Sequence, residues 1–140
     1  MTARHFIYRT LITNPGIANL VGGMDNPRIW AKKTMTSSIA AHPYMVYKLG
    51  NDTAEDLSED TDFSRQFFQV WFHDHEDTKT ADYDKIDDLV HATKQAFRLA
   101  SSPEDGVVAV KFLETSQDLN DETLNTVFRY SRFQLIREGK

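Results

Sequence analysis

The sequence contains no cysteine, and this absence excludes a disulfide scaffold, a cysteine zinc site and a cysteine nucleophile. It also has few residues that break regular structure, with six Gly and four Pro in 140 residues. Hydrophobic residues make up 40% and charged residues 26% of the chain, which is typical of a folded globular domain. The length is that of one ordinary domain. We therefore expect a single domain over residues 1–140.

Long apolar runs and an excess of basic charge are missing as well. No segment approaches the roughly 18 apolar residues that a membrane span requires, and the N-terminus lacks the apolar core of a signal peptide. We expect a protein that is made and used in soluble form, with no membrane partner. The net charge of −5 disfavours nucleic acid as the main ligand, because such binding begins with Lys and Arg neutralising phosphates.

Two helices are predicted from the spacing of apolar residues. The first covers residues 3–20 and is interrupted or restarted at Asn-Pro-Gly, residues 14–16, because proline removes a hydrogen bond from a helix interior. The second covers residues 82–100 and is strongly amphipathic. Its apolar face consists of Ile86, Leu89, Val90, Thr93, Phe97 and Ala100.

Five strands are predicted from runs of aromatic and β-branched residues, at 28–31, 43–49, 65–75, 107–119 and 124–138. In the third strand Phe68, Val70 and Phe72 alternate with Phe67, Gln69, Trp71 and His73, so we expect a central strand with both faces largely covered. The element order is helix, three strands, helix, two strands. It predicts an α+β fold, with one mostly antiparallel sheet of four or five strands, an N-terminal helix and a central amphipathic helix.

Two segments are predicted to lie outside regular structure. Residues 32–42 have small and hydroxyl-bearing side chains and are expected to form a loop or arm. Residues 51–62 carry six acidic residues and no basic one, so they are expected to form a mobile, solvated loop. Such a loop is either a hairpin tip in water or an acidic surface that faces a partner or a pore. The acidic residues are Asp52, Glu55, Asp56, Glu59, Asp60 and Asp62.

The sequence His73-Asp74-His75 is a candidate metal site. On a strand the two histidines share one face and Asp74 lies on the other. Zinc requires three or four ligands, so a further ligand would have to come from elsewhere in the chain. The candidates for it are His42, His91, Glu76 and Asp77. The alternative, which we favour, is the end of a strand that enters a solvated loop, and we predict no metal, no cofactor and no catalytic residue.

Arginines and aromatic residues alternate near the C-terminus. On a strand Arg129 and Phe133 point to one face, whereas Phe128, Tyr130 and Arg132 point to the other, so no purely aromatic and basic platform for nucleic acid forms. We expect the arginines to meet carboxylates, on this chain or on a neighbouring copy.

Trp30, Met35 and Ile39 are apolar residues in weakly structured sequence. They are expected either to pack under their own loop or to form the core of an interface. Both alternatives remain open at this stage.

The whole chain resembles the tail-terminator, or tail-completion, proteins of long-tailed (siphovirus-like) bacteriophages. The resemblance lies in the helix that ends near Gly22-Gly23, the short strand at 28–30, the strand at 43–49, the long strand at 66–75 followed by the helix at 82–99, and the hairpin that ends at 127–136. Members of that family form a hexameric ring on the last ring of the tail-tube protein. The ring stops tube polymerisation and presents the surface that docks to the connector of the head.

The resemblance implies a structural protein at the head-proximal end of the virion tail, present in the host cytoplasm during assembly. It implies no catalysis and no cofactor, with DNA passing through the lumen without sequence-specific binding. The acidic loop would then line that lumen, because a negative wall lets DNA slide. The residues expected at contacts between copies are Ile29, Trp30, Met35, Ile39, Arg129 and Arg132.

Three alternatives to a tail terminator remain. One is a head-to-tail connector or another minor tail protein, which would share the ring. A second is an α+β domain that binds a metal or ligand through His73 and His75. A third is a protein that binds single-stranded nucleic acid through the C-terminal hairpin.

Overall fold

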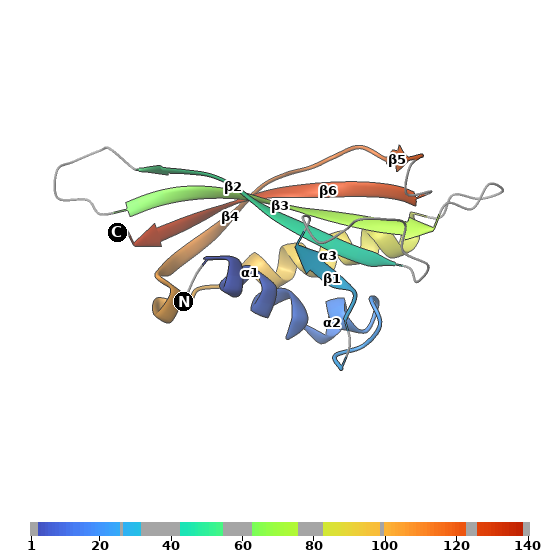
Figure 1. The fold of residues 1–140 in the computed structure, drawn as a ribbon, viewed down its shortest axis with the longest axis horizontal. Helices are drawn as coiled ribbons and strands as arrows, with labels where there is room; N and C mark the ends of the chain where they lie inside the picture. Colours follow the sequence, from blue (N-terminus) through green and yellow to red (C-terminus); the bar gives the residue numbers. More distant parts are fainter. Residues whose placement is uncertain are drawn as a thin grey trace.

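The computed structural model describes residues 3–25, 27–31, 43–54, 63–75, 83–98, 100–122 and 126–138, which form an α+β fold (Figure 1). The predicted fold class is thus confirmed. The elements, in order, are α1 (Ala3–Ile12), α2 (Pro15–Ala18), β1 (Ile29–Ala31), β2 (Tyr44–Ala54), β3 (Phe63–His75), α3 (Asp84–Arg98), the 3-10 turn η2 (Pro103–Asp105), β4 (Val107–Thr115), β5 (Leu119–Asp121) and β6 (Thr126–Glu138).

The N-terminal helical segment is divided in two at the predicted place. Pro15 occupies the first turn of α2, where its missing N–H costs no hydrogen bond. The side chain of Asn14 accepts a hydrogen bond from the backbone N–H of Ile17 at 3.2 Å and so caps the second helix. The chain therefore changes direction at residues 14–16, and helical geometry resumes at Pro15.

The sheet corrects the prediction of four or five mostly antiparallel strands. It has six strands in the order β1-β2-β3-β6-β4, with β5 paired to β6 beyond the end of β4. The short β1 runs parallel to β2, so the sheet is mixed. The predicted strand at 107–119 is split into β4, which ends at Thr115, and β5, which begins at Leu119. Between them the amide of Ser116 donates to the carbonyl of Tyr130 at 2.7 Å. Those two strands then pair with different parts of β6.

β2 is longer than predicted. It continues past Gly50 to Ala54 through a shift of register between Leu49 and Asp52. A Cβ at Gly50 would lie 3.2 Å from the backbone oxygen of Phe67, so this close approach of β2 to β3 favours glycine. The first four residues of the predicted acidic loop at 51–62 are therefore strand. Residues 55–62, and the predicted arm at 32–42, lie outside the described residues.

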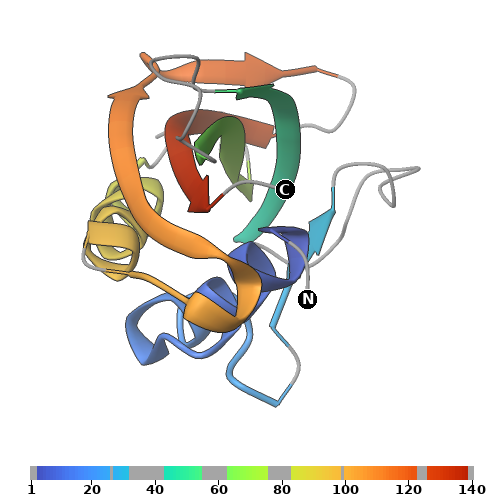
Figure 2. The same cartoon turned by 90° about the vertical axis from the view of Figure 1, so that its left-hand side faces the viewer.

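The helices lie on one face of the sheet, below β2, β3 and β6 in Figure 1. Phe68, Val70 and Phe72 point into the core on this face, as predicted. Helices α1 and α3 contribute Phe6 and Phe97, whose rings lie 6.2 Å apart. In the view of Figure 2, β2 and β4 flank the β3–β6 pair, so β3 is central as predicted.

The opposite face of the sheet, which we call the open face, carries the side chains of β2, β3 and β6 that alternate with those of the core. Within the described parts of the chain no helix covers it. Phe67, Gln69 and Trp71 are partly exposed there, whereas His73 at the end of the strand is buried. The prediction that both faces of β3 are covered is therefore wrong for most of the strand, because all the described helices pack on the other face.

Candidate functional site

One end of the open face is occupied by a row of stacked rings. Tyr44, His73 and Phe128 are neighbours in register on β2, β3 and β6. Their ring centroids are 4.9 Å and 5.0 Å apart, and the Tyr44 and His73 rings are nearly parallel. Trp30 of β1 extends the row, with its ring 5.9 Å from that of Tyr44. Tyr44 is 0% and His73 is 4% exposed, so this end of the face is a packed layer.

The surroundings of His73 bear on the predicted metal site. Its Nδ1 lies 2.8 Å from the hydroxyl oxygen of Thr126, which is fully buried. A metal would therefore have to bind through the other ring nitrogen. The side chain of His75 is not among those described, and no group of three or more His, Asp or Glu side chains is close enough to hold a metal within the described ranges. The His73/His75 site stays a prediction.

The pKa of one side chain in this row, Tyr44, is strongly raised. Burial raises the pKa of Tyr44 to about 12, with the nearby Thr126 hydroxyl opposing the rise and the charge of Asp121 adding to it. The phenol therefore stays protonated at neutral pH. It can act as a hydrogen-bonding group but not as a base.

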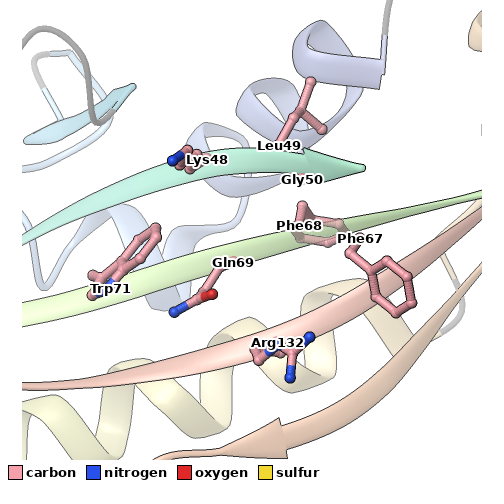
Figure 3. Close-up of a pocket in the computed structure, with 8 residues that line it drawn as sticks. All are labelled: Lys48, Leu49, Gly50, Phe67, Phe68, Gln69, Trp71 and Arg132. Carbon is pink, nitrogen blue, oxygen red and sulfur yellow. The ribbon is translucent and has the colours of Figure 1, made fainter. Parts of the chain in front are cut away.

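The middle of the open face contains a depression of about 330 Å³, shown in Figure 3. A row of three side chains in register crosses it: Lys48 on β2 opposes Gln69 on β3, which opposes Arg132 on β6. Because Gly50 has no side chain, β2 leaves space beside Phe67. The full lining is Lys48, Leu49, Gly50, Phe67, Phe68, Gln69, Trp71 and Arg132.

The depression is basic and aromatic. Arg132 pairs with Glu114 of β4 at 3.2 Å, and its guanidinium lies 5.9 Å from the ring centroid of Phe67. Both partners of this ion pair are about half exposed, so it contributes little stability and can exchange partners. The lining offers cations and flat apolar surface and lacks a hydroxyl or thiol nucleophile. Such a surface suits the binding of an anionic partner better than catalysis.

The second predicted arginine, Arg129, lies on the helix side of β6. It donates to Asp87 of α3 at 2.7 Å and to the carbonyl of Ser116 at 3.0 Å, and it lies 3.7 Å from Asp118. Carboxylate partners were predicted for both arginines, and the structure provides them within this chain. Arg129 thus connects α3 to the sheet.

The remaining interface candidates lie in different environments. Ile29 is 2% exposed and belongs to the core, so its side chain does not reach the surface where another copy could contact it. Trp30 is partly exposed on the open face, next to Tyr44. Met35 and Ile39 lie outside the described residues, as do the acidic residues of the predicted lumen loop except Asp52, whose backbone is in β2.

An acidic surface that the sequence interpretation missed lies at one end of the molecule. It combines the first turns of α3 with the segment around β5, which are held together by a hydrogen bond from the Tyr83 hydroxyl to the carbonyl of Leu119 at 3.0 Å. We call it the acidic end, and it consists of Asp84, Asp87, Asp88, Asp118, Asp121 and Glu122. The three acids of α3 were visible in the sequence as N-terminal helix residues. Their proximity to residues 118–122 depends on tertiary structure.

A buried charged cluster joins α1 to η2. Asp105 accepts hydrogen bonds from the Ser102 hydroxyl at 2.8 Å and from Arg9 at 3.1 Å, and its carboxylate is fully buried. No histidine completes a Ser–His–Asp arrangement with these three residues. The cluster is therefore a structural link between the N-terminal helix and the start of β4.

The fold and these surfaces define a small α+β protein whose helices cover one face of a mixed six-stranded sheet. The same fold occurs in a solved structure described as "Virion of native gene transfer agent (GTA) particle". The match covers 99% of this chain and 96% of that chain, with a TM-score of 0.72 and 19% sequence identity. At this identity the likeness shows a shared fold alone. No family model and no curated protein matches the sequence. Among the described helices, none is long and apolar enough to cross a membrane.

Proposed function

We propose that this chain is a structural protein of a bacteriophage-like particle, without catalytic activity, that assembles with other proteins of the virion. The observation that carries the proposal is the likeness, over nearly the full length of both chains, to a chain in the virion of a gene transfer agent. The basic, aromatic depression on the open face supports a role in contacts between proteins.

The specific role we propose is that of a tail terminator. Copies of the chain form a ring, a hexamer by resemblance to the family, at the head-proximal end of the tail tube. The ring ends polymerisation of the tube protein and provides the surface to which the head-tail connector docks. The support for this finer proposal is the resemblance in element order and length.

DNA would pass through the lumen of such a ring without sequence-specific contacts. We propose that residues 51–62 face this lumen, because their six acids would repel the phosphates and keep the DNA mobile. Asp52 lies in β2, within the part of this segment that the structure describes.

Contacts between copies would involve Trp30 and Arg132, which are accessible on the open face, together with Met35 and Ile39. Ile29 and Arg129 suit this role less well, because the first lies in the core and the second is paired within the chain.

The test is the length of tail tubes that assemble from the tube protein of the same particle as this chain is added. A terminator that caps one end of each tube shortens the tubes in proportion to its concentration and adds density at one end in electron micrographs. A connector or other minor tail protein, the alternative function, leaves the lengths unchanged. Unchanged lengths with bare tube ends would contradict the terminator proposal.

A further inference from the structure

We infer that neighbouring copies of this chain join by placing the acidic end of one copy on the basic open face of the next. The inference rests on the proposed ring and names its contact surfaces. It follows from the distribution of charge over the described residues, which is uneven in a way that the net charge of −5 conceals.

The open face is basic although the chain is acidic. Among the described residues, its exposed charged side chains are four cations and two acids, Glu114 and Glu138, and Glu114 is paired with Arg132 at 3.2 Å. The face also carries partly exposed aromatic rings, with Trp71 and Tyr130 6.4 Å apart. Arginine and aromatic residues at a shallow depression are typical of the energetically important centre of an interface. The four cations are Lys48, Arg65, Lys111 and Arg132.

The acidic end has the complementary charge. Five of its six acids are exposed, and Asp121 is partly buried. Arg129, at 25% exposure, is held between Asp87 and Asp118, and Lys85 is the other cation on this part of α3. Among the described residues of this end, the acids outnumber the cations by six to two.

The two surfaces cannot neutralise each other within one copy. The row Lys48–Gln69–Arg132 lies four residues along the strands from the row Tyr44–His73–Phe128, and β5 begins opposite Phe128. Four residues of strand span about 13 Å, well beyond the roughly 4 Å of an ion pair. A second copy is needed to bring the surfaces together.

The position of the surfaces also determines the type of assembly. They occupy different parts of the same molecule, so their contact is heterologous, with one copy's end on another copy's face. Heterologous contacts that close on themselves generate rings, whereas a contact of the open face with itself would oppose cations to cations.

A nucleic acid is the rival occupant of the basic face, since phosphates also seek cations. A second copy fits better because Glu114 lies among the cations and because the acidic end on the same chain would repel a polyanion.

The experiment is a charge swap with two double variants. The face variant is Lys48→Glu with Arg132→Glu, and the end variant is Asp88→Lys with Glu122→Lys; all four residues are exposed. Each variant alone places like charges opposite each other at every contact between copies. We therefore expect the fraction of the chain found in rings, in solution or on tube ends, to fall at least about tenfold. An equimolar mixture restores opposite charges at every contact of an alternating ring, so rings return. Native mass spectrometry reads both outcomes.

Matched controls use exposed residues outside both surfaces. Arg98→Glu controls for the face variant and Glu104→Lys for the end variant, and both controls should form rings like the original chain. Circular dichroism checks that each variant folds. Should a double variant unfold, the neutral pair Lys48→Gln with Arg132→Gln is expected to weaken the ring without abolishing it.

The outcomes separate this inference from the proposed function. Rings that form from either double variant alone, or a mixture that fails to restore them, would overturn the inference and leave the terminator role intact. Binding of oligonucleotides that the face variant abolishes, without any effect on rings, would assign the basic face to nucleic acid. An original chain that forms no ring, even on tube ends, would overturn the proposed function itself.

Discussion

At the scale of single residues, His73 illustrates what one strand's sequence can and cannot predict. Alternation along β3 correctly placed His73 opposite Phe72, because that pattern is local. The partners of His73 are not local: Thr126 is 53 residues away in sequence, and Tyr44 and Phe128 come from two other strands. Their identity depends on the register of three strands, which no periodicity within one strand reveals. The stacked row was therefore missed, although each of its rings was visible in the sequence.

Tyr44 offers a prediction at the same scale. Burial raises its pKa to about 12, above the value of about 10 in an unfolded chain, so its neutral form is preferred in the native state. The corresponding stability is fully present below pH 10 and is lost as the pH rises to 12. We expect the free energy of unfolding to fall over that range by at most about 2 to 3 kcal/mol through this group.

The measurement is urea denaturation of the original chain and of Tyr44→Phe between pH 8 and 12. The variant is expected to lose less stability over the alkaline range. Tyr47→Phe is the control, because burial also raises the pKa of Tyr47. Comparing the two variants separates the contribution of Tyr47 to the pH dependence of stability from that of Tyr44. Equal slopes for the original chain and Tyr44→Phe would contradict the account of this residue.

At the scale of elements, the helices were easier to predict than the strands. α3 begins two residues later and ends two residues earlier than predicted. The prediction is this close because the apolar residues of the helix recur over four turns and define one face. The sheet was less predictable. β1 has three residues, β5 has three, and the continuation of β2 depends on an irregular pairing near Gly50. Short strands of this kind are formed by their neighbours rather than by their own propensity.

The packing of α3 gives a second prediction. Phe97 is 1% exposed, and its ring lies 5.1 Å from that of Phe68 and 5.2 Å from that of Phe133. Phe97→Ala removes these contacts and leaves a cavity, so we expect a loss of about 3 to 5 kcal/mol in the free energy of unfolding. Gln95→Ala, on the exposed side of the same helix, should change it by less than about 0.5 kcal/mol. Urea denaturation compares the two. A similar small effect for both variants would mean that Phe97 does not anchor the helix to the sheet.

At the scale of the whole molecule, the one-sided arrangement of the helices is the feature that matters for function. It leaves a sheet face with a basic depression, and it separates that face from the acidic end. Nothing in the sequence pattern indicates this arrangement directly, because the chain's connections determine the face on which the described helices pack. Charge counts along the sequence also could not show that the acids of α3 gather with those near β5.

Under the proposed function, copies of this chain form a ring at the end of a tail tube. Native mass spectrometry of the purified chain, with and without tail tubes of the same particle, tests it most directly. We expect a ring of about six copies, which either exists in solution or forms from monomers when tubes are added. A chain that stays monomeric in the presence of tubes would contradict it, and retention of one equivalent of metal would return attention to His73 and His75.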